Sequence, residues 1–187
     1  MKKEDLLIPA DEKISMGLLN AHIHLLTGEI NEESTRRAIE WIIYENLNTN
    51  NEKPLSLYIN STGGDLNEAF GLIDIMRNSK RSIRTFGIGS VCSAAFLVFA
   101  SGTKGHRYIA QNTSIMCHQY ASEMNGKYHD MKAFVRESDL TNTRMQKLLQ
   151  ECTGLEPRSV KTKLIPPSDV WFTAEEIVEL GVADIIF

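Results

Sequence analysis

The sequence predicts an α/β fold in which strands and helices alternate along the chain. Short apolar runs with the character of strands are repeatedly followed by stretches in which apolar residues recur at helical spacing. Two of the strand-to-helix transitions, at 60–65 and 89–93, are rich in glycine and other small residues. This alternation is typical of crossover connections between parallel strands, so we expect a largely parallel sheet covered by helices.

The individual elements follow from local patterns. In chain order we predict a strand at 22–26, a helix at 32–47, a strand at 55–59, a helix at 66–76, a strand at 83–88, a helix at 94–101, strands at 108–110 and 114–117, a helix at 128–152, a helix at 174–180 and a strand at 182–187. Asn31 and Thr173 are suitable N-caps, and Gly154 and Gly181 follow predicted helix ends. The polar stretch Asn48–Lys53 is interpreted as a surface loop. No internal repeat is visible, and residues 1–187 are interpreted as one domain.

Composition excludes several classes of protein. The 187 residues carry 20 Lys and Arg against 24 Asp and Glu, a net charge of −4 that is unfavourable for nucleic-acid or anionic membrane binding. The apolar run Ala94–Ala100 is far shorter than the roughly 20 residues that span a bilayer. The three cysteines are widely spaced with no CxxC pair, and the N-terminus has no signal-peptide pattern, so a soluble cytoplasmic protein without a metal or other cofactor is expected.

The two glycine-containing turns are candidates for chemistry. Free N–H groups at helix N-termini favour negative charge, although Gly63-Gly64 alone more often indicates only a tight bend. Ser93 lies among small residues at the start of a predicted helix, where a nucleophile would be accessible. From the residues alone, an ordinary helix N-cap is the more frequent role for such a serine. Cys92 and Cys117 are rival nucleophiles, but both lie in apolar runs where a thiol is usually inert.

A serine nucleophile needs a base, and His118 is the best placed histidine because it ends an apolar strand. His22 and His24 share one face of a strand and could form half of a metal site, but no third ligand is identifiable. Spacing does not select the acid that would orient His118. Asp169 lies in the most restrained setting, between Pro167 and an apolar run, and could also be a simple turn residue.

Four segments together resemble the proteolytic subunit of the Clp protease, ClpP. They are Leu57–Gly64 (LYINSTGG, with Thr62 where the family has proline), Gly89–Phe96, Met116–Gln119 and Asp169–Glu176. They occur in the family's order, and the similarity extends from Leu25 to Ile186. The resemblance implies the ClpP/crotonase-like fold of repeated β-β-α units, with a protruding handle at about 119–152 and an axial segment at 1–20.

The resemblance also implies a serine endopeptidase that hydrolyses unfolded polypeptides or peptides through an acyl-enzyme. Ser93 would be the nucleophile, His118 the general base and Asp169 the acid that orients it. The resemblance implies further roles for other positions: oxyanion donors in the backbone of Gly64 and Ala94, substrate contacts at Gly63, Gln119 and Tyr120, and an unfoldase-docking patch at Tyr58, Phe86 and Ile88. The family assembles as two stacked heptameric rings fed by an AAA+ unfoldase of the ClpX, ClpA or ClpC type.

Several positions depart from the family pattern. Ala94-Ala95 replaces the common Met-Gly after the nucleophile, Tyr120 and the following residues replace a proline and glycine-rich stretch, and Ser56 replaces a tyrosine of the docking pocket. Two other functions stay open. One is a catalytically silent or regulatory ring subunit, and the other is an acyl-CoA enzyme of the crotonase type, which has a similar fold and does not need a Ser-His-Asp set.

Overall fold

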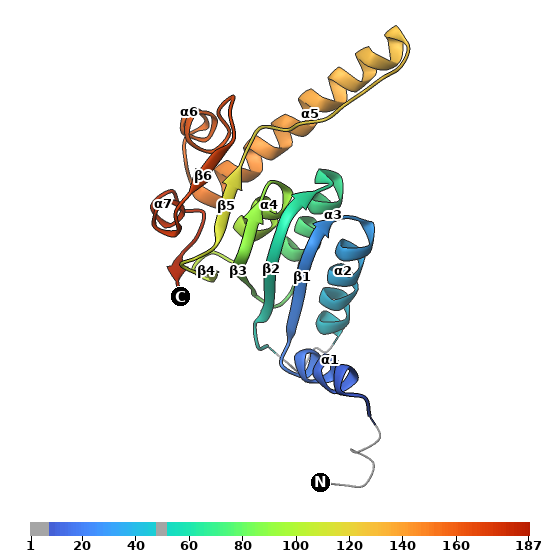
Figure 1. The fold of residues 1–187 in the computed structure, drawn as a ribbon, viewed down its shortest axis with the longest axis vertical. Coiled ribbons are helices and arrows are strands. Elements are labelled where there is room, and N and C mark those ends of the chain that lie inside the picture. The colour runs from blue at the N-terminus through green and yellow to red at the C-terminus, as the bar shows by residue number, and fades with distance from the viewer. Residues whose placement is uncertain (1–7, 48–51) are drawn as a thin grey trace.

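A computed structural model describes residues 8–47 and 52–187 of the chain (Figure 1). Residues 1–7 of the predicted axial segment and residues 48–51 of the predicted loop lie outside this range. The described residues form a seven-stranded sheet with the order β1-β2-β3-β4-β7, in which β5 pairs with β3 and β6 pairs with β5. All pairings are parallel except β5 with β6. The predicted α/β class is confirmed.

The elements largely follow the predicted periodicity. The strands are β1 (Ile23–Ile30), β2 (Leu55–Gly64), β3 (Ile83–Cys92), β4 (Arg107–Ile109), β5 (Ser114–Cys117), β6 (Val170–Phe172) and β7 (Ile185–Ile186). The helices are α1 (Ala10–Asn20), α2 (Glu32–Leu47), α3 (Leu66–Arg77), α4 (Ala94–Ala100), α5 (Tyr128–Thr153), α6 (Pro157–Ser159), a π-helical turn η2 (Val160–Leu164) and α7 (Ala174–Glu179).

Several elements differ from the prediction. Strand β1 continues past the predicted end at Leu26 to Ile30. Strands β2 and β3 continue through the residues expected to form turns, as far as Gly64 and Cys92, because each end still pairs with a neighbouring strand. The final strand is only Ile185–Ile186, since Gly181 ends α7 with a positive φ and the backbone of Val182 turns back to bond Ile177. Helix α1, the short helical segments α6 and η2, and strand β6 are additional to the elements that the pattern predicted.

The core lies between the sheet and the helices that cover one of its faces (Figure 1). Alternation along β2 directs Leu55, Leu57 and Ile59 into this core, where they are fully buried. Helix α4 lies against β2 and β3 and is buried along its whole length. It therefore starts deep inside the molecule, directly after β3.

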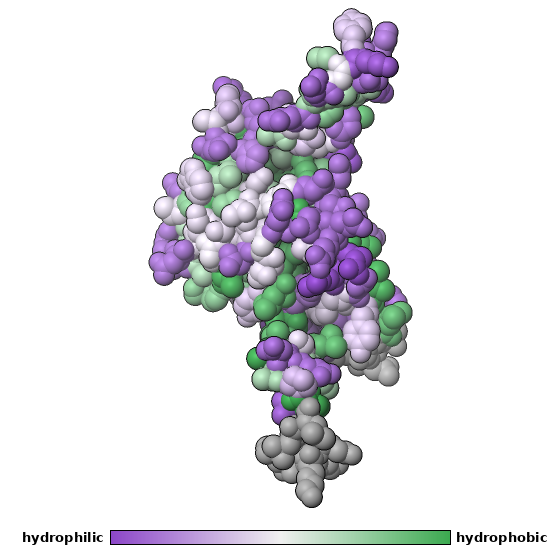
Figure 2. All heavy atoms as spheres, turned by 45° about the vertical axis from the view of Figure 1, so that its right-hand side comes forward, coloured by the Kyte–Doolittle hydropathy of each residue, from purple (hydrophilic) through white to green (hydrophobic). Residues whose placement is uncertain are grey.

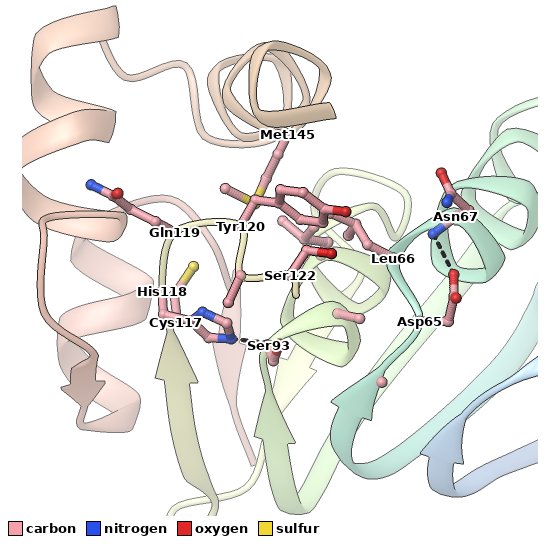
Figure 3. A pocket seen from close by; sticks show the side chains of 14 residues that line it. Asp65, Leu66, Asn67, Ser93, Cys117, His118, Gln119, Tyr120, Ser122 and Met145 are labelled. Atoms are coloured by element: carbon pink, nitrogen blue, oxygen red, sulfur yellow. Dashed lines mark hydrogen bonds between the residues drawn. The ribbon is translucent and has the colours of Figure 1, made fainter. Parts of the chain in front are cut away.

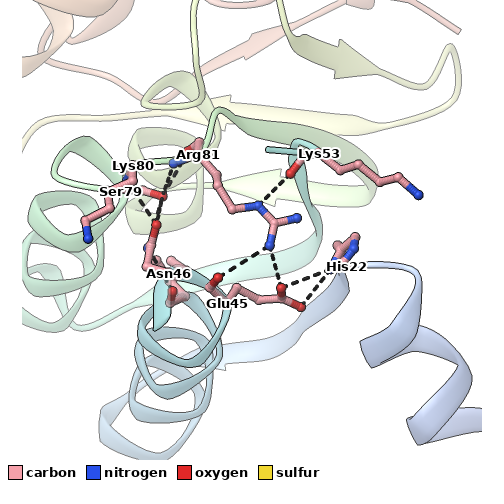
Figure 4. Close-up of polar contacts among 8 residues, drawn as sticks. His22, Glu45, Asn46, Lys53, Ser79, Lys80 and Arg81 are labelled. Atoms are coloured by element: carbon pink, nitrogen blue, oxygen red, sulfur yellow. Dashed lines mark hydrogen bonds and ion pairs between the residues drawn. The ribbon is translucent and has the colours of Figure 1, made fainter. Parts of the chain in front are cut away.

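A buried polar cluster joins α2 to the segments that enter three strands (Figure 4). The Glu45 carboxylate on α2 accepts from Arg81 Nη1 at 2.6 Å and contacts His22 Nδ1 at 2.9 Å. Arg81 Nε donates to the Lys53 carbonyl at 2.6 Å. Residues 22, 53 and 81 precede β1, β2 and β3, so the cluster ties one end of the parallel sheet together.

Helix α5 leaves the body of the protein. Figure 1 shows its N-terminal part extending beyond the sheet, with the segment after β5 running alongside it. Only its C-terminal half contributes buried residues, among them Met145 and Leu149. The projecting part carries exposed apolar side chains, including Tyr128 at 65% and Val135 at 59% exposure, and Figure 2 shows apolar atoms interspersed with polar ones on this arm.

Candidate active site

Ser93 has a backbone conformation that few residues other than glycine adopt. It joins β3 to α4 with φ 55° and ψ −125°, a conformation that typically costs a non-glycine residue about 1–3 kcal/mol. Its backbone N–H donates to the Met116 carbonyl at 3.0 Å. Its side chain makes no capping bond to α4, so the structure does not support the ordinary N-cap interpretation.

The Ser93 hydroxyl instead faces His118. Ser93 Oγ lies 2.7 Å from His118 Nε2, which is hydrogen-bond distance (Figure 3). The sheet explains this contact between residues far apart in the sequence. The last residues of β3 pair in parallel with β5, with Cys92 opposite Met116, so the residues that follow the two strands emerge side by side.

Asp169 lies near this pair without joining it. The antiparallel pairing of β5 and β6 sets Cys117 opposite Val170, which brings the neighbouring residues His118 and Asp169 to the same end of the ribbon. Asp169 is exposed. Within the described residues its carboxylate makes no hydrogen bond, and none links it to His118. Its orienting role therefore stays a prediction.

Gly63 and Gly64 bring backbone directly against the serine. Both have positive φ, 101° and 148°. A Cβ on Gly63 would lie 2.6 Å from Ser93 Cβ and 3.0 Å from Ala94 N, and one on Gly64 would lie 2.2 Å from the Ile30 carbonyl oxygen. Side chains at these positions are thus sterically excluded, and the backbone of the glycine turn borders the same space as Ser93.

A pocket of about 180 Å³ opens at Ser93 and His118. Its lining includes Gly64 and Ala94, the two residues with predicted oxyanion donors, and the predicted substrate residues Gln119 and Tyr120. Gly63 is not in its lining. Figure 3 shows the Tyr120 ring beside Met145 and Leu66, whereas the Gln119 side chain points away and donates to the Ile165 carbonyl at 3.1 Å.

Sequence reasoning missed part of the pocket wall. The lining residues Leu66, Leu97 and Met145 were predicted only as parts of helices. Nothing in their local pattern distinguishes a pocket residue from a core residue. Their contribution depends on α3, α4 and α5 meeting beside Ser93, which is a property of the tertiary structure.

The rival cysteine nucleophiles are poorly suited to reaction. Burial raises the pKa of the Cys117 thiol to about 12, and burial likewise raises the pKa of Cys92. Both side chains are buried, and Cys92 Sγ lies 3.6 Å from the Ser114 carbonyl. Because the thiolate is the reactive form, neither thiol is activated at neutral pH.

The two histidines considered for a metal site have other partners. His22 contacts Glu45 in the polar cluster, and His24 stacks on Trp41 with ring centroids 5.2 Å apart. Burial, aided by Arg37, lowers the pKa of His24. Among residues 8–47 and 52–187, no three His, Cys, Asp or Glu side chains are grouped so that they could hold a metal ion.

The predicted docking residues lie on the sheet face opposite the main helical layer. Tyr58, Phe86 and Tyr108 stack in a row, with centroid distances of 4.5 and 4.7 Å, and Phe187 packs edge-on against Phe86. Strand register explains the row, because these residues occupy equivalent positions on β2, β3 and β4. Ile88, farther along β3, is half-buried. Tyr108 and Phe187 were not among the predicted residues.

Comparison with known proteins decides the family. A profile described as "Clp protease" matches residues 10–187 of this chain. The chain belongs to the Clp protease family. It is also 30% identical over 172 residues to "ATP-dependent Clp protease proteolytic subunit 2" of Treponema denticola, an alignment that covers 91% of this chain and 84% of that protein.

Membership of the Clp protease family confirms the fold and the general activity expected from the resemblance. The sheet of mostly parallel strands with its helices is consistent with the ClpP fold. No helix in the described part of this Clp protease family member is long and apolar enough to cross a membrane.

Proposed function

We propose that this Clp protease family member is a serine endopeptidase that cleaves unfolded polypeptides or peptides through an acyl-enzyme. The observation that carries the proposal is the 2.7 Å contact between Ser93 Oγ and His118 Nε2 at a strained turn that borders a pocket. A hydroxyl within hydrogen-bond reach of an imidazole, held at a sharp strand-to-helix turn, is the arrangement that activated serine nucleophiles use.

The proposed reaction proceeds in two halves. His118 accepts the Ser93 proton as the hydroxyl attacks the scissile carbonyl, and then returns that proton to the leaving amine. The backbone N–H groups of Gly64 and Ala94 stabilise the oxyanion. One such donor typically contributes about 3 kcal/mol to the transition state. Water then attacks the acyl-enzyme, with His118 again acting as base, and releases the second product.

In this proposal Asp169 completes the site in the working state. Its place at the end of the β5–β6 ribbon supports this, since the antiparallel register sets Asp169 beside His118. Catalytic hydrogen bonds are often long or absent in the free enzyme and tighten when the productive complex forms.

The proposal includes assembly into two stacked heptameric rings. The exposed apolar side chains on the projecting half of α5 support a contact between rings, because pairing with a second copy would remove them from water. The row of Tyr58, Phe86 and Tyr108 supports docking of an AAA+ unfoldase. The name of the Treponema denticola relative, "ATP-dependent", supports the same partner class. We place the protein in the cytoplasm, where its three free cysteines stay reduced.

A labelling and cleavage experiment tests the proposal. A fluorophosphonate probe should label the wild-type protein and a fluorogenic peptide should be cleaved, whereas Ser93→Ala should lose both. Ser90→Ala is the matched control, because Ser90 lies in β3 close to the site and its hydroxyl makes no hydrogen bond within the described residues. Intact rings without labelling would instead indicate a silent subunit. Turnover of acyl-CoA thioesters without peptide cleavage would indicate a crotonase-type enzyme.

The assembly is tested separately by light scattering. The expected particle has about the mass of two heptameric rings, and a stable monomer would contradict this part of the proposal. Charge substitutions at Val135 and Met131, which are both exposed on α5, should separate the rings without unfolding the subunit.

A further inference from the structure

Ser61 is a buried polar residue of β2, two positions before Gly63. Only 2% of it is exposed, and its Oγ accepts a hydrogen bond from the Gly63 backbone N–H at 3.1 Å. A buried hydroxyl is unfavourable unless it is hydrogen-bonded, so a serine here needs this bond or an equivalent one. Because acceptor and donor are two residues apart, the bond closes a local turn at the end of β2.

The turn that Ser61 closes contains the glycine pair that borders the active site. Two consecutive glycines have broad freedom in φ and ψ. The pairing of Gly63 and Gly64 with the end of β1 restrains this backbone, and the Ser61 bond adds a restraint on the Gly63 N–H. Among the described residues, the Ser61 bond is the single side-chain hydrogen bond to the backbone of Gly63 or Gly64. Thr62 adds no ring constraint of the kind a proline would provide.

The position of Gly63 determines what lies against Ser93. A Cβ built on Gly63 would lie within 3.0 Å of three atoms: Ser93 Cβ, the Cys92 carbonyl oxygen and Ala94 N. The peptide that follows Gly63 carries the N–H of Gly64. The bond to Ser61 therefore commits the Gly63 N–H to the turn and holds the Thr62–Gly63 peptide, and the Gly64 N–H lies in the next peptide along the chain.

We infer that Ser61 is a positioning residue that fixes the Gly63–Gly64 backbone against Ser93 and so directs the Gly64 N–H toward the developing oxyanion. It touches neither substrate nor reacting atoms. This inference rests on the proposed function and deepens it. It separates the roles of the two glycines, since the Gly63 N–H is held by Ser61 and the Gly64 N–H serves the reaction.

The test compares Ser61→Ala, Ser61→Thr and Thr62→Ala in the assembled protein. Ser61→Ala should lower kcat about 10- to 100-fold with KM nearly unchanged. This decrease in kcat is no larger than the one that follows removal of a whole oxyanion donor. A peptide aldehyde forms a tetrahedral adduct with Ser93 and should lose affinity by the same factor as kcat. A noncovalent product peptide should bind as to wild type, because it uses no oxyanion donor.

The control variants separate positioning from general damage. Ser61→Thr keeps the hydroxyl and should recover most of kcat. Thr62→Ala removes an exposed neighbouring side chain that makes no hydrogen bond in the described part of the chain, and should match wild type. If Ser61→Ala does not assemble, Ser61→Cys serves in its place, since sulfur is a weaker acceptor of similar size and should give an intermediate kcat.

The outcomes are distinguishable. Wild-type kcat and aldehyde affinity in Ser61→Ala, or a change confined to KM, would overturn the inference while leaving the serine peptidase intact. Absence of any Ser93-dependent cleavage or adduct in the wild-type protein would overturn the proposed function, and the role of Ser61 with it.

Discussion

The backbone of Gly63 is packed so closely on Ser93 that a Cβ at Gly63 would lie 2.6 Å from Ser93 Cβ. No adjustment of a flexible side-chain tip can relieve this overlap, because the Cys92 carbonyl and Ala94 N lie within 3.0 Å of the same point. The glycine turn after β2 and the serine turn after β3 thus form one unit. Space for a reacting carbonyl exists only while both keep their positions.

Gly63→Ala should therefore abolish activity. The added methyl group must push the two turns apart, and alanine strongly disfavours the φ of 101° found here. We expect peptide cleavage and fluorophosphonate labelling to fall by at least ~100-fold, the scale of losing an oxyanion donor. Gly71→Ala is the control, since this α3 glycine has no atom within 4 Å of a new Cβ and should gain ~0.5–1 kcal/mol of stability. Equal activity in both variants would contradict the packing argument.

Asp169→Asn tests the third member of the proposed triad. If the carboxylate reaches His118 during turnover, kcat should fall by up to about 10⁴-fold while assembly is unchanged, because the amide favours the wrong imidazole tautomer. Asp74→Asn, an exposed acid on α3, should leave kcat unaltered. A wild-type rate for Asp169→Asn would show that Asp169 is only an exposed turn residue with no part in the reaction.

The buried Glu45–Arg81 pair should be important for stability. Both side chains are almost completely buried, so replacing Glu45 with Gln leaves an uncompensated guanidinium. Loss of one partner of a buried pair typically costs about 3–5 kcal/mol, and we expect a decrease at the lower end because the amide still accepts a hydrogen bond. Glu40→Gln breaks the exposed Arg36–Glu40 pair on the same helix and should change stability by less than ~0.5 kcal/mol. Urea unfolding at one fixed protein concentration measures both, and similar values would refute the distinction.

Asp184 should give the protein part of its resistance to acid. Burial opposes ionisation of this carboxyl, but hydrogen bonds from Arg107 outweigh it and lower the pKa of Asp184. Arg107 Nη2 donates to Oδ1 at 2.6 Å and Nε to Oδ2 at 2.8 Å. Because the folded pKa lies below the unfolded one, the pair stabilises the fold above about pH 4 and this contribution disappears as pH falls further.

The measurement for this pair is the free energy of unfolding against pH. Asp184→Asn should be less stable than wild type at pH 7, and the two curves should converge as pH falls below about 4. Curves that stay parallel throughout the acid range would show that Asp184 does not contribute in this way.

Local periodicity was sufficient to predict most of the fold. The helices α2, α3, α4 and α5 each bury a face or more, so their apolar spacing is visible in the sequence. Helix α1 buries none of its residues and so lacks the pattern that would reveal it. Strand β6 has only three residues and follows two prolines, which obscure a strand in any single sequence.

The site was harder to predict than the fold. Ser93 and His118 were identifiable as candidates because each ends a strand, but their contact depends on β5 pairing with β3, which spacing does not reveal. Asp169 could be chosen among 24 acids only through the resemblance to ClpP. The aromatic row needed the register of β2, β3 and β4, which brings Tyr108 beside Phe86 although no motif links them.

The unusual backbone angles at Ser93 imply a conflict between durability and catalysis. A glycine there would adopt the same angles without steric strain. This relief of about 1–3 kcal/mol exceeds the ~0.5–1 kcal/mol that the greater freedom of unfolded glycine costs, so the Ser93→Gly protein should melt at a higher temperature than the native one although it could not form the proposed covalent intermediate. Selection for heat tolerance alone would favour glycine at this position, so a serine here fits the proposal that its hydroxyl is needed for hydrolysis.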